Sequence, residues 1–138
     1  AVLHYEYGRS LGVTCFYKEA ENELILAHDL DKKSGGVFYL SLTELGRLNL
    51  AQKNYPAAVA YFERVLAELD PAIAAKKAPS FYADVLDDYA SALSGAGRPK
   101  NAEAAAKQAA EARANVTADQ PGTERTPYGT QCSKGMTD

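Results

Sequence analysis

The stretch Asn54–Leu66, NYPAAVAYFERVL, contains the pattern that decides the fold. Apolar residues recur at intervals of three and four along it and just beyond it: Tyr55, Ala58, Val59, Phe62, Val65, Leu66 and Leu69. This spacing places them on one stripe of a helix with about 3.6 residues per turn. Because Ala58 stands among aromatic rings in that stripe, the pattern predicts an amphipathic helix that another helix approaches closely.

Glycine, proline and asparagine residues divide the rest of the chain into similar segments. No segment alternates with a period of two, so we predict no strands. The connections are short, which lets consecutive helices pack antiparallel. The expected helices span about residues 2–14, 17–31, 36–51, 55–69, 79–95 and 100–115.

One skeleton occurs three times along these segments. In each copy a small residue of the first helix lies twelve positions before an alanine of the second: Gly8 and Ala20, Gly46 and Ala58, Ala90 and Ala102. Further core positions follow in each second helix: Leu24 and Ala27, Phe62 and Val65, Ala106 and Ala109. The recurrence predicts three helical hairpins, each joined by a close contact between small residues.

This skeleton resembles the tetratricopeptide repeat (TPR) family, in which W-x2-L-G-x2-Y is followed by A-x3-F and then by P. LTELGRLN with NYPAAVAYF and the following Asp70-Pro71 carries the resemblance most fully. Asn49 stands in place of the usual tyrosine, and Lys32 in place of the closing proline. The copies are longer than the usual repeat of about 34 residues, and in this they are similar to the kinesin light chain variety.

The resemblance implies an all-α fold over residues 1–116, a right-handed α-solenoid of about three helical hairpins in a TPR-like superhelix. Residues 117–138 are rich in Gly, Pro, Thr and Ser, and we expect an irregular or partly disordered tail there. The sequence leaves a second interpretation of the tail open. Tyr128 could anchor it along the helices, and Cys132 could form a possible disulfide with Cys15, which is expected in the exposed turn after the first helix.

The resemblance also implies a function. First helices of such arrays line a concave groove that holds segments of partner proteins. The groove candidates are Tyr5, Arg9, Thr43, Arg47, Leu50, Asp84, Asp87 and Ser91. They run from basic to acidic and would suit a ligand of mixed charge, although polar residues on such a face are equally typical of a plain solvated surface.

We therefore expect a non-catalytic protein–protein interaction module that binds a peptide or a partner-protein segment in the concave groove. A structural or assembly subunit, or a fragment of a longer repeat protein, is the alternative. The first helix lacks a polar outer cap, so the alternative includes self-association through that N-terminal helix.

Composition argues against other classes. The net charge of −3 comes from 18 acidic and 15 basic residues scattered along the chain, with no basic block for nucleic acid or anionic lipid. The chain contains no run of about 18 apolar residues, so we predict no membrane span. The two histidines and two cysteines lack partners at metal-ligand spacing, and no catalytic motif occurs, so we expect no enzyme, no metal and no cofactor.

The compartment is open at this point, because two cysteines would pair in an oxidising environment and stay reduced in the cytosol. The cysteine in the tail and the missing start of the chain favour the bacterial cell envelope or periplasm over the cytoplasm. The sequence does not identify the ligand, since the chemistry of such a groove varies independently of its scaffold.

Overall fold

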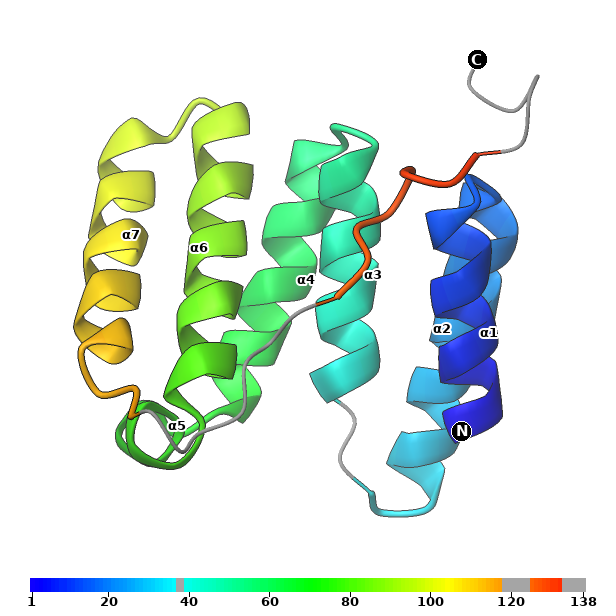
Figure 1. Ribbon diagram of the computed structural model, residues 1–138, viewed down its shortest axis with the longest axis horizontal. Coiled ribbons are helices and arrows are strands. Elements are labelled where there is room, and N and C mark those ends of the chain that lie inside the picture. The colour runs from blue at the N-terminus through cyan, green and yellow to red at the C-terminus, as the bar shows by residue number, and fades with distance from the viewer. Residues whose placement is uncertain (37–38, 118–124, 133–138) are drawn as a thin grey trace.

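The computed structural model describes residues 1–36, 39–117 and 125–132, and within them the only regular elements are helices. The all-α class predicted from the sequence is therefore confirmed. Figure 1 shows the long helices side by side in one row, with α1 near one end and α7 at the other. The helices are α1 Val2–Val13, α2 Tyr17–Lys33, α3 Tyr39–Ala51, α4 Tyr55–Glu68, α5 Pro71–Lys77, α6 Pro79–Gly95 and α7 Pro99–Arg113.

The row consists of three helical hairpins. Helix α1 packs along α2, α3 along α4, and α6 along α7. Neighbouring hairpins touch through α2 with α3 and through α4 with α6, while α3 also contacts α1 and α6. This arrangement leaves the three first helices, α1, α3 and α6, to make up one side of the row.

All three hairpins close through the same turn. A residue with positive φ follows each first helix: Cys15 at 74°, Lys53 at 61° and Gly97 at 78°. The next backbone N–H bonds back to a carbonyl five residues earlier: Phe16 to Leu11 at 2.8 Å, Asn54 to Asn49 at 2.9 Å and Arg98 to Leu93 at 2.9 Å. Left-handed residues with this bonding end many helices. Each turn residue lies seven positions after the small residue of its copy, so the turns repeat in the register predicted from the sequence.

Small residues bring the helices of the first two hairpins together. A Cβ atom at Gly8 would lie 2.9 Å from Leu24 Cγ, and one at Gly46 would lie 2.7 Å from Phe62 Cε1. Neither distance accommodates a methyl group without movement of the neighbour. Leu24 and Phe62 are both 0% exposed, and burying such a side chain stabilises the fold by about 1.5–3 kcal/mol.

The segment that follows α4 differs from the sequence prediction. It was expected to be a plain connection, yet it contains the short helix α5. Asp70 caps this helix, because its side chain accepts hydrogen bonds from the backbone N–H groups of Ala72 at 3.0 Å and Ile73 at 3.2 Å. Pro71 then supplies a first residue whose φ already suits a helix.

The third hairpin also departs from the predicted pattern. Ala106 is exposed, although the repeat predicts it in the core, and Ala105 is buried instead. Helix α7 lies at the end of the row and packs against α6, so it buries a narrower stripe than α4 does. That stripe consists of Ala102, Ala105, Ala109 and Ala112.

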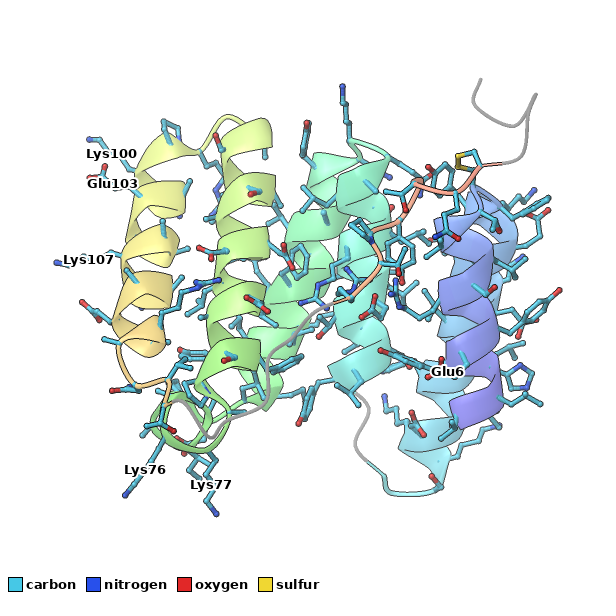
Figure 2. All side chains as sticks on the ribbon, in the orientation of Figure 1. Glu6, Lys76, Lys77, Lys100, Glu103 and Lys107 are labelled. Carbon is cyan, nitrogen blue, oxygen red and sulfur yellow. A yellow bond between two sulfur atoms is a disulfide. The ribbon has the colours of Figure 1, made fainter. Side chains whose placement is uncertain are left out.

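The outer side of α7 is polar. Figure 2 shows Lys100, Glu103 and Lys107 projecting away from the body of the molecule. A charged outer face ends a row of stacked hairpins without leaving apolar surface for a further one. Among the helices that the structure describes, none has the length and apolar character needed to cross a bilayer.

The contact between α3 and α4 gives a testable prediction. Ala58→Leu should lower the free energy of unfolding by about 1–3 kcal/mol, because Ala58 is fully buried and added methylenes overpack the core. Ala60→Leu is the matched control, since Ala60 is exposed on the same helix. Urea denaturation of both variants measures the difference. Equal losses would show that the assigned register is wrong.

Candidate functional site: a buried glutamate beneath the C-terminal segment

The C-terminal segment Arg125–Cys132, called here the tail segment, lies against the side of the row formed by the first helices. Figure 1 shows it crossing α3 and reaching the end of α1. A disulfide joins Cys132 to Cys15 across a sequence separation of 117 residues, with the two Cα atoms 5.3 Å apart. Of the two interpretations that the sequence leaves open for the tail, the described residues match the one in which it folds back.

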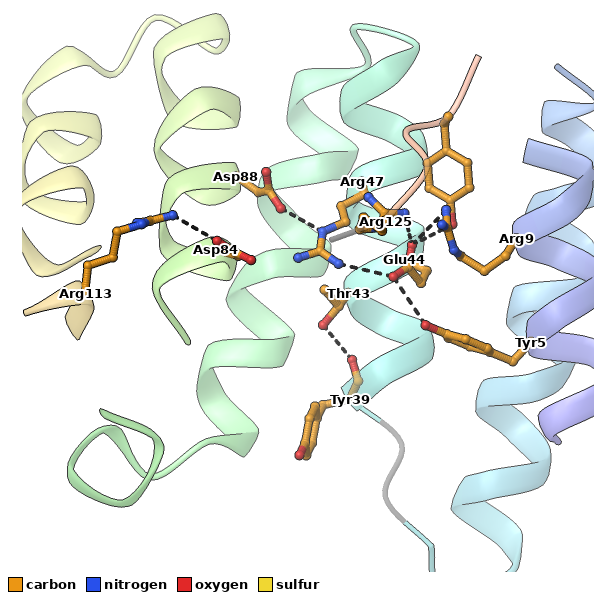
Figure 3. A network of polar contacts seen from close by, with 11 residues as sticks. Tyr5, Arg9, Tyr39, Thr43, Glu44, Arg47, Asp84, Asp88, Arg113 and Arg125 are labelled. Atoms are coloured by element: carbon orange, nitrogen blue, oxygen red, sulfur yellow. Dashed lines mark hydrogen bonds and ion pairs between the residues drawn. The ribbon is translucent and has the colours of Figure 1, made fainter. Parts of the chain in front are cut away.

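Glu44 on α3 is the centre of the polar contacts beneath the tail segment (Figure 3). Its side chain is only 5% exposed. From α1, the Tyr5 hydroxyl donates to Glu44 Oε2 at 3.3 Å, and Arg9 Nη1 lies 3.7 Å from Oε1. From α3 itself, Arg47 Nη1 donates to Oε2 at 3.2 Å.

The tail segment completes the shell around this carboxylate. The Tyr128 hydroxyl donates to Glu44 Oε1 at 2.7 Å, and Arg125 Nη2 donates to the same oxygen. Burying a carboxylate is costly unless it is paired and hydrogen-bonded, and here donors from α1, α3 and the tail segment meet that requirement together.

The network continues from α3 onto α6. Arg47 Nε donates to Asp88 Oδ2 at 2.7 Å, so one guanidinium connects Glu44 to the next hairpin. We call Tyr5, Arg9, Glu44, Arg47 and Asp88 the Glu44 site. A separate pair of contacts lies nearer the start of α6, where Arg113 of α7 reaches both Asp84 at 2.9 Å and Asp87 at 2.6 Å.

Tyr128 is the most closely held residue of the tail segment. It is 8% exposed and belongs to the main hydrophobic core cluster. Its ring lies so close to Gly12 of α1 that a Cβ atom there would collide with it, and that same atom would lie 3.1 Å from Leu48 Cδ1. The Arg9 guanidinium carbon lies 4.8 Å from the ring centroid and that of Arg125 lies 5.0 Å from it, within the range of cation–π attraction.

Backbone hydrogen bonds fix the position of the segment along α1. The N–H groups of Gly129 and Gln131 donate to the carbonyls of Gly12 and Val13, both at 3.1 Å. These carbonyls lie in the last turn of α1, and that of Gly12 also accepts from the Cys15 N–H at 3.2 Å. Arg9 Nη2 also donates to the carbonyl of Thr126 at 3.0 Å.

Burial and the Glu44 charge shift the titration of the surrounding groups. Burial and then the Glu44 charge raise the pKa of Tyr5 to about 12, and the same two causes raise the pKa of Tyr128. Burial raises the pKa of Asp88, partly opposed by Arg47. Burial lowers the pKa of Arg125, with the Arg47 and Arg9 charges acting in the same direction against Glu44.

The structure distributes the groove candidates over several settings. Tyr5, Arg9 and Arg47 meet around Glu44, whereas Asp84 and Asp87 pair with Arg113. Leu50 packs half-buried against the core, and Ser91 is exposed. Thr43 was predicted to face the groove, but it is 1% exposed and its hydroxyl donates to the Tyr39 carbonyl at 2.8 Å. It is therefore satisfied within its own helix.

Sequence reasoning did not single out Glu44, Asp88, Arg113 or Arg125 as site residues. Glu44 lies between Leu42 and Leu45, and a charged residue there is ordinary in an amphipathic helix. The one available signal was position: Glu44 lies three residues before Arg47, so their side chains share a helix face. The partner in the tail segment, 81 residues away, gives no local pattern.

Among the described residues, the carboxylates of Glu44, Asp84, Asp87 and Asp88 are each paired with arginine, and Glu44 also accepts from tyrosine. Over the same residues, no group of three or more His, Cys, Asp or Glu side chains is placed to hold a metal ion. Comparison with protein-family models, with curated proteins and with solved structures finds no match for this chain.

Gly12 allows a direct test of how the tail segment is seated. Gly12→Ala should displace the Tyr128 ring and expose Arg125, whose side chain is 25% exposed in the structure. Trypsin should then cut after Arg125 faster than in the wild type, which mass spectrometry of the reduced digest measures. Gly36→Ala is the control, because a Cβ at Gly36 meets only ordinary contacts. Unchanged cleavage in Gly12→Ala would contradict the seat.

The tyrosine pKa shifts predict a pH dependence. The pKa of Tyr128 is higher in the folded protein than in the unfolded chain, where it is about 10. The contribution of its hydroxyl to the free energy of unfolding is therefore fully present below pH 10, and it is lost as the pH rises from 10 towards the pKa of the folded state. At pH 8, Tyr128→Phe should be less stable than the wild type by about 1.5–3 kcal/mol, because a hydrogen bond to a charged group is lost. Above pH 10 this gap should narrow by about 1.4 kcal/mol per pH unit. Urea denaturation at pH 8, 10 and 11 measures it, and a constant gap would show that the hydroxyl is not buried against a charge.

Proposed function

We propose that this chain is a TPR-like helical repeat protein that binds a segment of a partner protein on the side formed by α1, α3 and α6. The observation that carries the proposal is the tail segment, which occupies that side as a bound peptide would. It is non-helical, its backbone is hydrogen-bonded at both N–H and carbonyl groups, and one aromatic side chain is buried. A turn that recurs in all three hairpins and the close contacts at glycine in the first two support the repeat assignment.

The role we propose is recognition without catalysis. The charged groups of the Glu44 site are committed to one another, which suits a surface that orients a ligand. The disulfide favours an oxidising compartment over the cytosol, and the bacterial cell envelope or periplasm is one such compartment.

The test uses the 138-residue chain with its tail segment released. We call the variant with Arg125→Ala, Tyr128→Ala and Cys132→Ser the opened chain. Peptides selected by phage display against the opened chain should bind with affinities that fall as the salt concentration rises. The residues whose nuclear magnetic resonance chemical shifts change on peptide binding should cluster on α1, α3 and α6.

The same peptides provide a control for the site. Arg47→Ala in the opened chain should weaken their binding, because Arg47 holds Glu44 in place, whereas Lys107→Ala on the outer side of α7 should not. Circular dichroism confirms that each variant is folded. Failure to select any peptide, or shifts that cluster elsewhere, would refute the proposal.

A second candidate function, assembly into a larger structure, is favoured by the first hairpin. Six of its apolar side chains are exposed: Val2, Leu3 and Tyr7 on α1, and Ile25, Leu26 and Leu30 on α2. This alternative predicts a stable oligomer that Leu3→Glu dissociates in sedimentation experiments. Arg47→Ala should leave that oligomer intact, whereas it should weaken peptide binding.

A further inference from the structure

The tail segment identifies the features that the Glu44 site recognises. Two side chains enter the site, Arg125 and Tyr128, and both donate to Glu44 Oε1. The seat of the tyrosine is shaped for a ring, because Gly12 leaves room that any other residue would fill. The recognised pattern is an arginine followed three residues later by a tyrosine.

The residue after the tyrosine is constrained as well. Gly129 has φ of 76°, and a Cβ atom there would collide with the Tyr17 hydroxyl. In this conformation the Gly129 N–H donates to the Gly12 carbonyl at the end of α1. We therefore expect glycine directly after the tyrosine in a ligand that repeats the contacts of the tail segment, because other residues rarely adopt this φ.

The helices supply the receptor half of the site. Glu44 contacts Tyr5, Arg9 and Arg47, and Arg47 contacts Asp88, through contacts that do not involve the tail segment. Two arginines and two carboxylates balance in charge. We expect these contacts to persist when the tail segment leaves, which would reduce the ordering that a ligand has to induce on binding.

The tail segment brings a third arginine to this balanced set. Arg125 lies near Arg9 and Arg47, and these like charges together with burial oppose its charged form. The disulfide at Cys132 holds the C-terminal end of the tail segment, one residue beyond its last backbone hydrogen bond at Gln131. Tethering raises the local concentration of a segment, so even a weakly binding occupant stays in place.

We propose that the Glu44 site binds, in trans, a partner-protein segment with the pattern Arg-x-x-Tyr-Gly, and that the chain's own tail segment is its internal competitor. This inference rests on the proposed function and names the ligand class for the same site. The tail segment must leave before the partner binds. An external dithiol can start that release: it is oxidised to a disulfide while Cys15 and Cys132 become thiols.

The experiment measures fluorescence anisotropy of a fluorescein-labelled heptapeptide, RTPYGTQ, identical to residues 125–131. The opened chain should bind it, and the oxidised wild type should not. Wild type reduced with dithiothreitol should bind it more weakly than the opened chain, because the released tail still competes from the same molecule.

Two matched peptides and one protein variant test the assigned contacts. The peptide RTPFGTQ lacks only the tyrosine hydroxyl and ATPYGTQ lacks only the guanidinium, and each should bind the opened chain at least about tenfold more weakly. Glu44→Gln in the opened chain should weaken RTPYGTQ binding to a similar degree, with folding checked by circular dichroism. The two altered peptides keep the test decisive if that variant fails to fold.

The outcomes separate this inference from the proposed function. If selected peptides bind the opened chain on α1, α3 and α6 but RTPYGTQ does not, the ligand class is wrong and the recognition function stands. If neither binds to a folded opened chain, both are wrong. Equal binding of RTPYGTQ to the oxidised wild type and to the opened chain would place the peptide outside the Glu44 site and would also overturn the inference.

Discussion

The carboxylate of Glu44 is the constraint on which the arrangement of the first helices and the tail segment depends. It lies on α3, the middle one of the three first helices, and its side chain is only 5% exposed. A charge in that position is tolerated only if donors surround it. Those donors come from α1, from α3 and from a segment 81 residues farther along the chain, so one side chain fixes the relative positions of all three.

The helical scaffold makes this burial possible. Glycine at positions 8 and 46 lets α1 and α3 each pack closely on its partner helix, and a third glycine at position 12 leaves space for the ring of Tyr128. Arg47 then carries the network to Asp88 on α6. Packing by small residues and pairing of buried charges are thus coupled: the first sets the spacing of the helices, and the second determines which segment can occupy their shared side.

The sequence predicted what depends on local pattern. Periodic apolar residues located the long helices. The twelve-residue interval paired Gly46 with Ala58, whereas the atoms nearest to a Cβ at Gly46 belong to the ring of Phe62, four residues farther along α4. Ala106 was misplaced because a helix at the end of a row has fewer neighbours, which no repeat pattern records. Glu44 could not be identified, since its importance comes from the fold bringing Arg125 and Tyr128 to it. For the tail, the sequence favoured an irregular or partly disordered segment and left an anchor at Tyr128 with a disulfide at Cys132 as the alternative.

The most direct test of this account is a double-mutant cycle between Glu44 and Tyr128. The free energies of unfolding of the wild type, Glu44→Gln, Tyr128→Phe and the double variant are measured by urea denaturation at pH 7. If the buried charge holds the tail segment, the two changes should be coupled by at least about 1 kcal/mol, the difference between a charged and a neutral hydrogen bond. Additive effects would show that Glu44 and the tail segment stabilise the protein independently, and this would contradict the account.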